Sequence, residues 1–448
     1  MAKDIEVPAR TKASIDWSSL LRKEDWWAVW LGFLILALAS MRVVTWLPKT
    51  GAWGVDPSTA FQAGNMPSFV LLGYFILLGL GLLALTSVAV LSMKEKIKPY
   101  WAAFPVTFFL AFLSLFLANQ ATIRTWGLEY VLWALVFGLL ISNTVGTPKW
   151  LKPAVKTELF VKIGLVLLGA ETLFNDILSA GAFGMAQAVV VVLLVWYFCY
   201  FLAVKAGLKK SFASVLASGV SICGVSAAIA AGGAIKADRK EVSYAISLVL
   251  LLAMPMLVGL PILAKAVGMV DAVAGAWIGG TIDTTPAVVA AGALYSSKAM
   301  SVASIIKMSQ NALIGVAAFL LSLYWVLRVD RNPGGPGGER PRLEEIWYRF
   351  PKFIVGFIIA SVVFSLLLVP TMGYKPVQAV LDITKSVRGW FFAMAFIGIG
   401  LDTKLSELVK AGRGKPFAVF LAAQTFNILL TLVLAYALFG GLFFPAPI

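Results

Sequence analysis

Long apolar runs separated by short polar loops are the dominant pattern along this chain of 448 residues. About thirteen runs approach the roughly 20 residues with which a helix crosses the hydrocarbon core of a bilayer. They lie near residues 27–47, 68–93, 101–120, 127–145, 158–176, 183–206, 211–236, 241–268, 272–295, 299–327, 352–372, 388–403 and 416–440. With 60% hydrophobic and only 13% charged residues, the chain is predicted to be a polytopic membrane protein rather than a soluble one.

The seventh and ninth runs differ from the others because Ala, Gly, Ser and Thr replace the larger apolar residues. Small residues let backbones approach closely inside a helix bundle. Neighbouring Gly and Ser also allow a helix to break, and broken backbone at membrane depth persists only against protein or a water-filled cavity. Secondary transporters hold their substrates at such breaks. We therefore expect the functional site where these two runs are interrupted.

Basic residues gather in the loops that follow even-numbered runs, which places those loops and the N-terminus in the cytoplasm. Lys236, Arg239 and Lys240 violate this rule if the seventh run spans the membrane fully. They obey it if the seventh and ninth runs are re-entrant hairpins that enter from opposite sides, which leaves about eleven crossings. The alternative is thirteen crossings with two unwound helices. The direction of the runs favours the opposed hairpins.

Two internal matches align without gaps. Ser226–Leu248 matches Thr285–Lys307, and Gly169–Gly181 matches Gly400–Gly412. The second pair lies on runs that cross in opposite directions in either topology, which is typical of the inverted repeats of secondary transporters. Shared composition or similar helix-end chemistry is the alternative explanation for each match. The predicted fold is thus all-α with 11–13 membrane segments, inverted repeats and two broken or re-entrant segments.

The loop at Asn332–Gly338, NPGGPGG, is the one clear linker. The first 26 residues are charged and lack an apolar run, so we expect an arm rather than a signal peptide. The expected division is a cytoplasmic arm at 1–26, scaffold or oligomerisation helices at 27–126, a first repeat with both broken segments at 127–328, a cytoplasmic linker at 329–351 and C-terminal repeat helices at 352–448.

Four motifs resemble the YeiH family, also called UPF0324, of bacterial inner-membrane proteins that are described as proposed sulfate exporters. They are SICGVSAAIAA (221–231), GGTIDTTPAVVAAG (279–292), SIIKMSQNALI (304–314) and AFIGIGLDTKLSELVKAG (395–412). The resemblance covers roughly residues 131–440. It implies membership of the wider superfamily of cation–proton antiporters and bile-acid-type transporters, with inverted repeats.

The chain departs from the pattern of that family at four positions. Asp283 stands in place of His, Gln310 and Glu171 each in place of Arg, and Asp402 in place of Thr, whereas Lys307 matches the family lysine. Each change makes the site more acidic or removes a base. The departures weigh against a doubly charged anion such as sulfate for this chain.

Hydroxyl groups beside the two expected breaks are the candidate substrate ligands, because free N–H groups at helix N-termini and nearby hydroxyls bind oxyanions. The predicted substrate-binding set is Ser221, Gly224, Ser226, Thr281, Thr284, Thr285, Lys307 and Gln310. The alternative is that each Ser or Thr bonds back to its own helix.

Three carboxylates are candidates for a coupling ion: Asp283, Glu171 and Asp402. A carboxylate inside a membrane segment is costly unless it has a partner. Asp283 is expected to bind a cation, carry a proton or pair with Lys307. Glu171 and Asp402 either bind Na⁺ or lie at the two water interfaces.

These features favour a secondary transporter that moves a small anion, such as sulfate, a related oxyanion or an organic acid, across the bacterial inner membrane. A cation–proton antiporter without an anionic substrate is the first alternative. An intramembrane enzyme is the second, with Asp283 and Cys223 as its only candidate groups. We expect no enzymatic activity, because no catalytic motif such as a Walker A loop or HExxH is present.

No cofactor or metal is expected beyond Na⁺ or H⁺ as a coupling ion, and the chain has no histidine. The expected partners are the lipid bilayer, the small anion and a second copy in a homodimer. The net charge of +15 reflects loop topology, so nucleic acid is not an expected partner.

The charge pattern predicts that the N-terminus, Lys152 and Pro336 face the cytoplasm. Single cysteines at these positions should resist a membrane-impermeant thiol reagent added to intact cells and react after lysis, in a background without Cys199 and Cys223. Labelling at residue 336 from outside would reverse the orientation.

Overall fold

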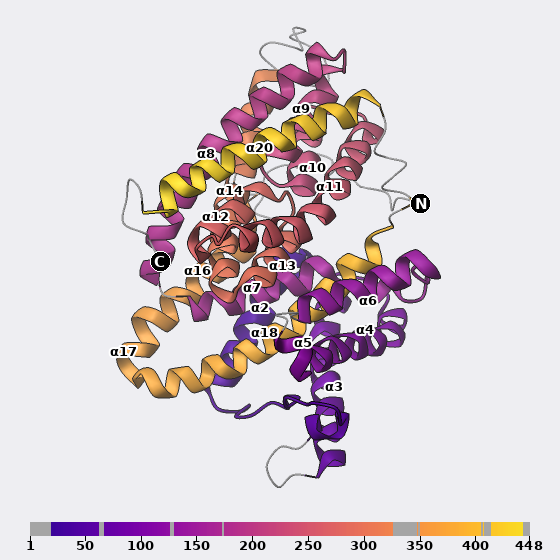
Figure 1. Ribbon diagram of the computed structural model, residues 1–448, viewed down its shortest axis with the longest axis vertical. Coiled ribbons are helices and arrows are strands. Elements are labelled where there is room, and N and C mark those ends of the chain that lie inside the picture. The colour runs from indigo at the N-terminus through magenta and orange to yellow at the C-terminus, as the bar shows by residue number, and fades with distance from the viewer. Residues whose placement is uncertain are drawn as a thin grey trace. The chain divides into compact units, whose positions relative to one another are not determined.

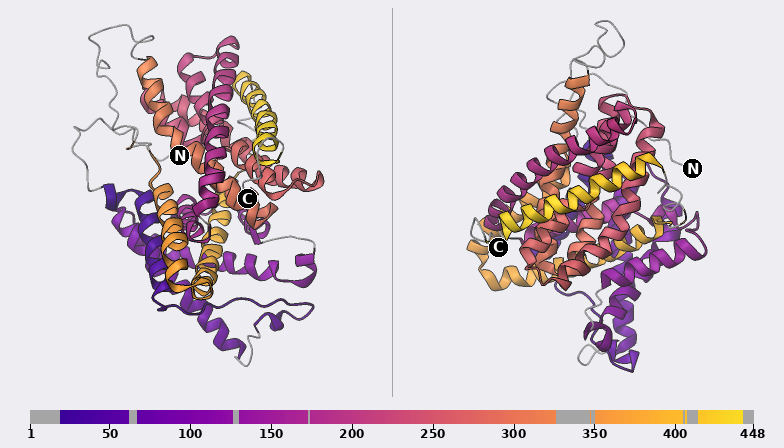
Figure 2. Two further views of the ribbon diagram at one scale, coloured as in Figure 1. Left: turned by 90° about the vertical axis from the view of Figure 1, so that its left-hand side faces the viewer. Right: turned by 45° about the horizontal axis from the view of Figure 1, so that its top comes forward.

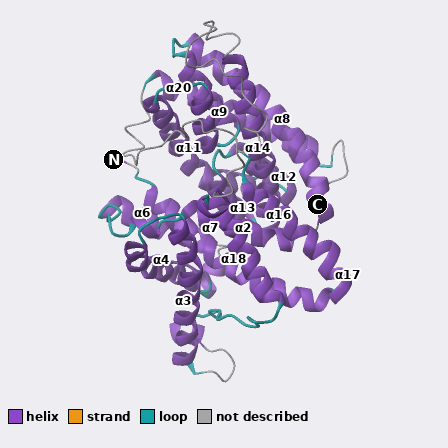
Figure 3. Cartoon of the chain, turned by 180° about the vertical axis from the view of Figure 1, so that it is seen from behind, coloured by secondary structure: helices purple, strands orange, loops and turns teal. Residues whose placement is uncertain are grey.

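The structure, a computed structural model, describes residues 19–61, 67–125, 130–172, 174–325, 347, 350–404, 406 and 414–441. These residues are helical apart from loops and one isolated β-bridge between Trp53 and Gln120 (Figure 3). Most of the expected arm at 1–26 and linker at 329–351 lies outside them, as does Pro336. The all-α class is confirmed.

Seven helical stretches among the described residues are long and apolar enough to cross a membrane, as expected of a polytopic membrane protein. They are Ser68–Ser92, Ile97–Ala118, Ala180–Lys205, Lys240–Ala266, Ser297–Tyr324, Lys352–Met372 and Lys415–Phe439. Each of them falls on a predicted apolar run.

The chain forms two compact units that alternate along the sequence. Unit 1 comprises residues 1–15, 176–351 and 406–448, and unit 2 comprises residues 16–175 and 352–405. Each compact unit therefore combines segments that are distant in the sequence. The described helices of unit 1 are α8 (Phe174–Lys205), α9 (Lys210–Ser221), α10 (Gly224–Ala234), α11 (Arg239–Ala266), α12 (Asp271–Thr281), α13 (Thr285–Tyr295), α14 (Ser297–Tyr324) and α20 (Lys415–Phe439).

Within unit 1, α8 and α20 lie side by side (Figure 1). The ring of Phe198 stacks on Phe426 at 4.4 Å, and Phe183 meets Phe439 edge to face at 5.9 Å. Because residue numbers rise on one helix as they fall on the other, the two helices are antiparallel.

The seventh apolar run is a re-entrant hairpin rather than a single helix. The chain leaves helix at Ile222 and Cys223, between α9 and α10. Gly219 then lies beside Ala228, and Gly232 lies beside Val215. Residues increasingly far before the break thus contact residues increasingly far after it, so α9 and α10 are antiparallel.

The ninth run reverses in the same way, as its contacts with α14 show. Gly275 and Gly279 on α12 lie against Ala299 and Ala303, so α12 runs parallel to α14. Gly292 on α13 instead lies against Met300, while Thr285 at its start reaches Asn311. The chain therefore turns back between Thr281 and Thr285, and the opposed-hairpin alternative is the one that the structure adopts.

The gap-free match between these regions extends to their helices. Helices α10 and α13 both have 11 residues, and the helices that follow them, α11 and α14, both have 28. The two regions thus share one sequence of elements: half-helix, break, half-helix and long helix.

Unit 2 is built around α7 (Thr157–Glu171), against which α2 (Glu24–Ser40), α16 (Lys352–Val362) and α18 (Tyr374–Asp402) pack (Figure 2). Its other described elements are α1 (Ser19–Arg22), η1 (Pro57–Phe61), α3 (Ser68–Ser92), α4 (Ile97–Ala118), α5 (Ala121–Thr125), α6 (Tyr130–Thr144), η2 (Lys152–Ala154), the π-helical segment η4 (Val363–Leu368) and α17 (Val369–Met372).

An ion-pair cluster ties the start of α2 to α7. The ammonium of Lys162, in the middle of α7, lies 3.0 Å from a carboxylate oxygen of Glu24, 3.0 Å from one of Asp25 and 3.5 Å from one of Glu158. A largely buried lysine needs such partners. The last residues of the expected cytoplasmic arm at 1–26 are therefore part of unit 2.

Among the boundaries that differ from the predicted runs, two have a local cause. Helix α18 begins at Tyr374 instead of 388, because a helix continues through Lys375, Asp382 and Lys385 although a hydropathy pattern stops there. Helix α2 ends at Ser40 instead of 47, because Arg42 takes the left-handed conformation with φ of 58°.

The matched segments Gly169–Gly181 and Gly400–Gly412 share their helix ends. Helix α7 ends at Glu171 and α18 at Asp402. The next residue is a threonine in both, and its N–H donates to the glycine carbonyl three residues earlier. Each threonine hydroxyl also donates to the carbonyl four residues earlier. The remainder of the second segment lies largely outside the described residues.

Glycine at the contact of α6 and α18 predicts a sharp steric effect. A Cβ on Gly400 would lie 2.6 Å from the Leu135 carbonyl oxygen and 2.8 Å from the Gly138 Cα, whereas a Cβ on Gly389 meets nothing within 4 Å. We expect Gly400→Ala to lower the free energy of unfolding by about 1–3 kcal/mol. Gly389→Ala, the same change in the same helix, should leave it unchanged or raise it slightly. Thermal unfolding of both variants in detergent checks this, and equal midpoints would contradict the close contact.

Candidate functional site

The tips of the two hairpins meet in unit 1. The N–H of Gly224, the first residue of α10, donates to the Asp283 carbonyl at 2.7 Å. A helix break exposes backbone groups that must find partners where water is absent. This hydrogen bond satisfies one group from each break, and it fixes one tip against the other.

Side chains of α14 cap the carbonyl ends of both first half-helices. Lys307 donates from its ammonium to the Ile222 carbonyl at 2.7 Å and to Oε1 of Gln310 at 2.9 Å. Gln310 donates in turn from Nε2 to the Gly280 carbonyl at 3.1 Å. A cation at a helix C-terminus is favourable because the carbonyl dipoles point toward it. Lys307 and Gln310 thereby connect the end of α9 to the end of α12.

Helix α20 supplies a second pair of caps. Gln424 donates from Nε2 to the Thr281 carbonyl at 2.9 Å. Asn427 donates from Nδ2 to the same carbonyl at 3.2 Å and to the Val220 carbonyl at 3.4 Å. Both amides are buried, so α20 holds the same two helix ends from another direction.

Asp283 is the carboxylate of the site. It is 2% exposed, and its Oδ2 is buried without a hydrogen-bond partner. The ion pairs of the described residues do not include one between Asp283 and Lys307, whose ammonium bonds Ile222 and Gln310 instead. Asp283 lies just before α13, whose free N–H groups favour a negative charge. Its second oxygen remains available for a proton or a cation.

Other buried atoms without partners in the described part of unit 1 have the same character. They are the amide oxygens of Gln187, Asn311, Gln424 and Asn427. The amide nitrogens of Gln424 and Asn427 share the Thr281 carbonyl, which keeps these two groups beside the tips. All of these atoms accept hydrogen bonds, so the interior of unit 1 has an excess of acceptors that a cation or a donor would satisfy.

The five predicted hydroxyls divide into two groups. Ser221 is buried and donates back to Ala217 in its own helix. Thr281 is hydrogen-bonded to Thr431, and Thr285 accepts from Asn311 at 3.0 Å. Ser226 is exposed and Thr284 is half-buried. Only these last two are therefore open to an incoming molecule.

Glu171 and Asp402 belong to unit 2, not to the unit that holds Asp283. Glu171 forms an ion pair with Arg388, with Oε2 at 3.0 Å from Nη2, while Asp402 is exposed. The three expected coupling carboxylates thus occur as a buried group at the tips, a paired group and a surface group.

Sequence reasoning missed four buried polar residues in the two units. Gln187, Gln424 and Asn427 are buried on α8 and α20, and Arg388 is buried on α18. For Gln187, Gln424 and Asn427 the signal was present, because each amide interrupts a long apolar run. Among the described residues, no group of three or more His, Cys, Asp or Glu gathers as a metal site would require.

The family model described as conserved hypothetical protein 698 matches residues 103–419, which is most of the chain. A UPF0324 membrane protein of Rhodopirellula baltica is 41% identical over 89% of this chain and 72% of its own length. The chain belongs to the UPF0324 family of membrane proteins.

Two further UPF0324 membrane proteins extend this relationship. One from Nitratidesulfovibrio vulgaris is 42% identical over 78% of this chain, and the match covers only 61% of that longer relative. One from Nitrosomonas europaea is 31% identical over 92% of this chain and 94% of its own length. No solved structure matches the chain significantly. Membership in the family confirms the resemblance inferred from the four motifs, and it supports a membrane location.

The tip contact predicts a size constraint at Gly224. A Cβ on this residue would overlap the side chain of Val249 on α11. Gly224→Ala should therefore lower the midpoint of thermal unfolding, and adding Val249→Ala should recover part of the loss because it removes the overlapping methyl groups. The Val249→Ala single variant is the control for the cavity that it creates. Additive effects of the two changes would show that they do not touch.

Proposed function

We propose that this UPF0324 protein is a secondary transporter of the bacterial inner membrane that moves a small anion by alternating access, coupled to Na⁺ or H⁺ at Asp283. The observation that carries the proposal is the meeting of two re-entrant hairpin tips around a buried carboxylate oxygen that has no partner. Interrupted helices that meet in this way are the typical binding sites of secondary transporters.

The anion would bind on the open side of the tips. Helices α10 and α13 both begin there, and neither has a side-chain cap at its N-terminus. Free N–H groups at such ends attract an oxyanion or a carboxylate without a full positive charge. The hydroxyls of Ser226, which is exposed, and Thr284, which is half-buried, would then supply further hydrogen bonds.

Asp283 would supply the coupling. A carboxylate repels an anion, so the two would share the tips only when a proton or a cation neutralises Asp283. Lys307 contributes positive charge nearby, and two of its three N–H donors are already used by Ile222 and Gln310. Anion and cation would therefore bind together, and each would raise the affinity of the other.

Inverted repeats would provide the two alternating states. Helix lengths after the two breaks are equal, which supports a repeat of Ser226–Leu248 in Thr285–Lys307. The helix ends at Glu171 and Asp402 are also alike, which supports a second repeat within unit 2. A secondary transporter uses such symmetry to expose one site to either side in turn.

A cation–proton antiporter without an anionic substrate is the second candidate. The excess of acceptor oxygens in unit 1 favours it, because Asp283, Asn311, Gln424 and Asn427 all present oxygen atoms that lack a donor. In this case Na⁺ or H⁺ would be the transported species, and the open N–H groups would have no anionic ligand.

An anion-dependent thermal shift on the purified protein tests the proposal. Sulfate, other oxyanions and small carboxylates are added one at a time, with and without Na⁺ and across pH. We expect at least one anion to raise the midpoint of unfolding, and more strongly with Na⁺ or at lower pH. Asp283→Asn should remove that dependence, whereas Asp382→Asn, which changes an exposed carboxylate on α18, should preserve it.

Two results would contradict the proposal in different ways. If an anion stabilises the protein equally under all conditions, Asp283 does not couple. If no anion stabilises it but Na⁺ or pH does so through Asp283, the antiporter is the correct alternative.

A further inference from the structure

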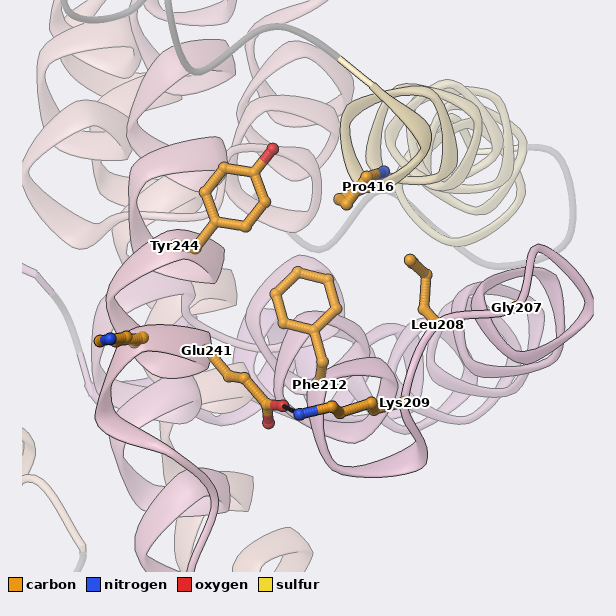
Figure 4. A pocket seen from close by; sticks show the side chains of 8 residues that line it. Gly207, Leu208, Lys209, Phe212, Glu241, Tyr244 and Pro416 are labelled. Atoms are coloured by element: carbon orange, nitrogen blue, oxygen red, sulfur yellow. Dashed lines mark ion pairs between the residues drawn. The ribbon is translucent and has the colours of Figure 1, made fainter.

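A surface pocket lies in unit 1 where the turn between α8 and α9 meets the first turns of α11 and α20 (Figure 4). Its volume of about 450 Å³ falls in the range of roughly 300–1,000 Å³ that is typical of small-molecule sites. The residues that line it are Gly207, Leu208, Lys209, Phe212, Lys240, Glu241, Tyr244 and Pro416.

The pocket is at the level of the membrane surface because three candidate spans end there. One span ends at Lys205, and two others begin at Lys240 and Lys415. Each of these residues lines the pocket or is within two positions of a lining residue. A pocket formed by the polar ends of spanning helices faces the lipid headgroups rather than the acyl chains.

Charge around the pocket is strongly positive. Two carboxylates offset part of the charge. Glu241 is 3.4 Å from the Lys209 ammonium and accepts from Ser211, and Asp238 caps α11. The ion pair between Lys209 and Glu241 involves an exposed lysine, so it contributes little to stability. Six exposed lysines line the pocket or are within four positions of a lining residue: Lys205, Lys209, Lys210, Lys236, Lys240 and Lys415.

The inner wall of the pocket is apolar. The rings of Phe212 and Tyr244 stack at 5.8 Å, and Leu208 and Pro416 lie opposite them in Figure 4. A free inorganic anion would gain nothing from such a wall. A molecule with an acidic head and an apolar body would use both the wall and the lysines.

We propose that this pocket binds an anionic phospholipid, with the phosphate among Lys209, Lys240 and the neighbouring lysines and the glycerol and first acyl carbons against Leu208, Phe212 and Tyr244. Basic pockets between membrane helices take acidic headgroups in this way. Helices α9 and α20 pass from this pocket to the hairpin tips, where Ser221, Gln424 and Asn427 lie. The bound lipid therefore contacts the start of α9, which leads into one tip, and the start of α20, which caps both breaks.

The test compares lipids added to the full-length protein in a neutral detergent. Phosphatidylglycerol should raise the midpoint of unfolding and remain attached in native mass spectrometry, and phosphatidylcholine should do neither. The Lys209→Gln/Lys240→Gln double variant should bind phosphatidylglycerol roughly tenfold more weakly or worse. The control is Lys265→Gln/Lys298→Gln, which removes the same charge from exposed positions at the other ends of α11 and α14.

Leu208→Trp separates a pocket from diffuse attraction, because it fills the apolar wall without changing the charge. It should lower the affinity for phosphatidylglycerol, and Leu208→Phe serves the same purpose if the tryptophan variant does not fold. An unchanged affinity in the folded variant would overturn the proposal, and so would equal losses in the two lysine double variants. Equal stabilisation by inorganic phosphate or by an oligo-glutamate peptide would overturn it in favour of a soluble anion or an acidic partner.

Discussion

The hydrogen bond between the Gly224 N–H and the Asp283 carbonyl joins the two places where the chain leaves helix inside unit 1. Each break frees several backbone groups, and each free group costs several kcal/mol if it faces hydrocarbon. The carbonyl ends are satisfied by donors from α14 and α20, namely Lys307, Gln310, Gln424 and Asn427. This requirement shapes the packing around the tips, because α14 and α20 must both place their polar side chains beside the two breaks.

The same arrangement separates the charges of the site. Lys307 neutralises the carbonyl end of α9, and Asp283 lies at the N–H end of α13. Each charge is thereby placed against a helix end of opposite partial charge, and the two do not need each other as direct partners. A carboxylate held in this manner keeps one oxygen uncommitted. Asp283 is therefore not one half of a permanent buried ion pair with Lys307.

Close backbone contact is the second constraint on the fold. Gly275 lies against the backbone of Ala299 in unit 1, and Gly138 lies against Gly400 in unit 2. The hydrophobic effect does not drive helices together in a bilayer, because lipid tails are as apolar as the side chains. Their association depends instead on dispersion and on hydrogen bonds at short range. At the α6–α18 contact, Ser142 donates to the Gly400 and Thr403 carbonyls. The glycines thus bring helix backbones close enough for a serine hydroxyl to bridge them.

The sequence by itself determined which segments are helical in the membrane and where two of them break. A chain inside the hydrocarbon core must form helices, because its backbone groups find no water there. Gly, Ala and Ser in the seventh and ninth runs indicate where these helices break. Basic residues after the seventh run also favoured re-entrant hairpins, because loop charge depends on topology alone. Tertiary structure decided the partners: that Lys307 caps Ile222 instead of pairing with Asp283, that Glu171 pairs with Arg388, and that α20 reaches the tips. These contacts join residues far apart in the chain, and one sequence carries no signal for which of its lone polar residues will meet.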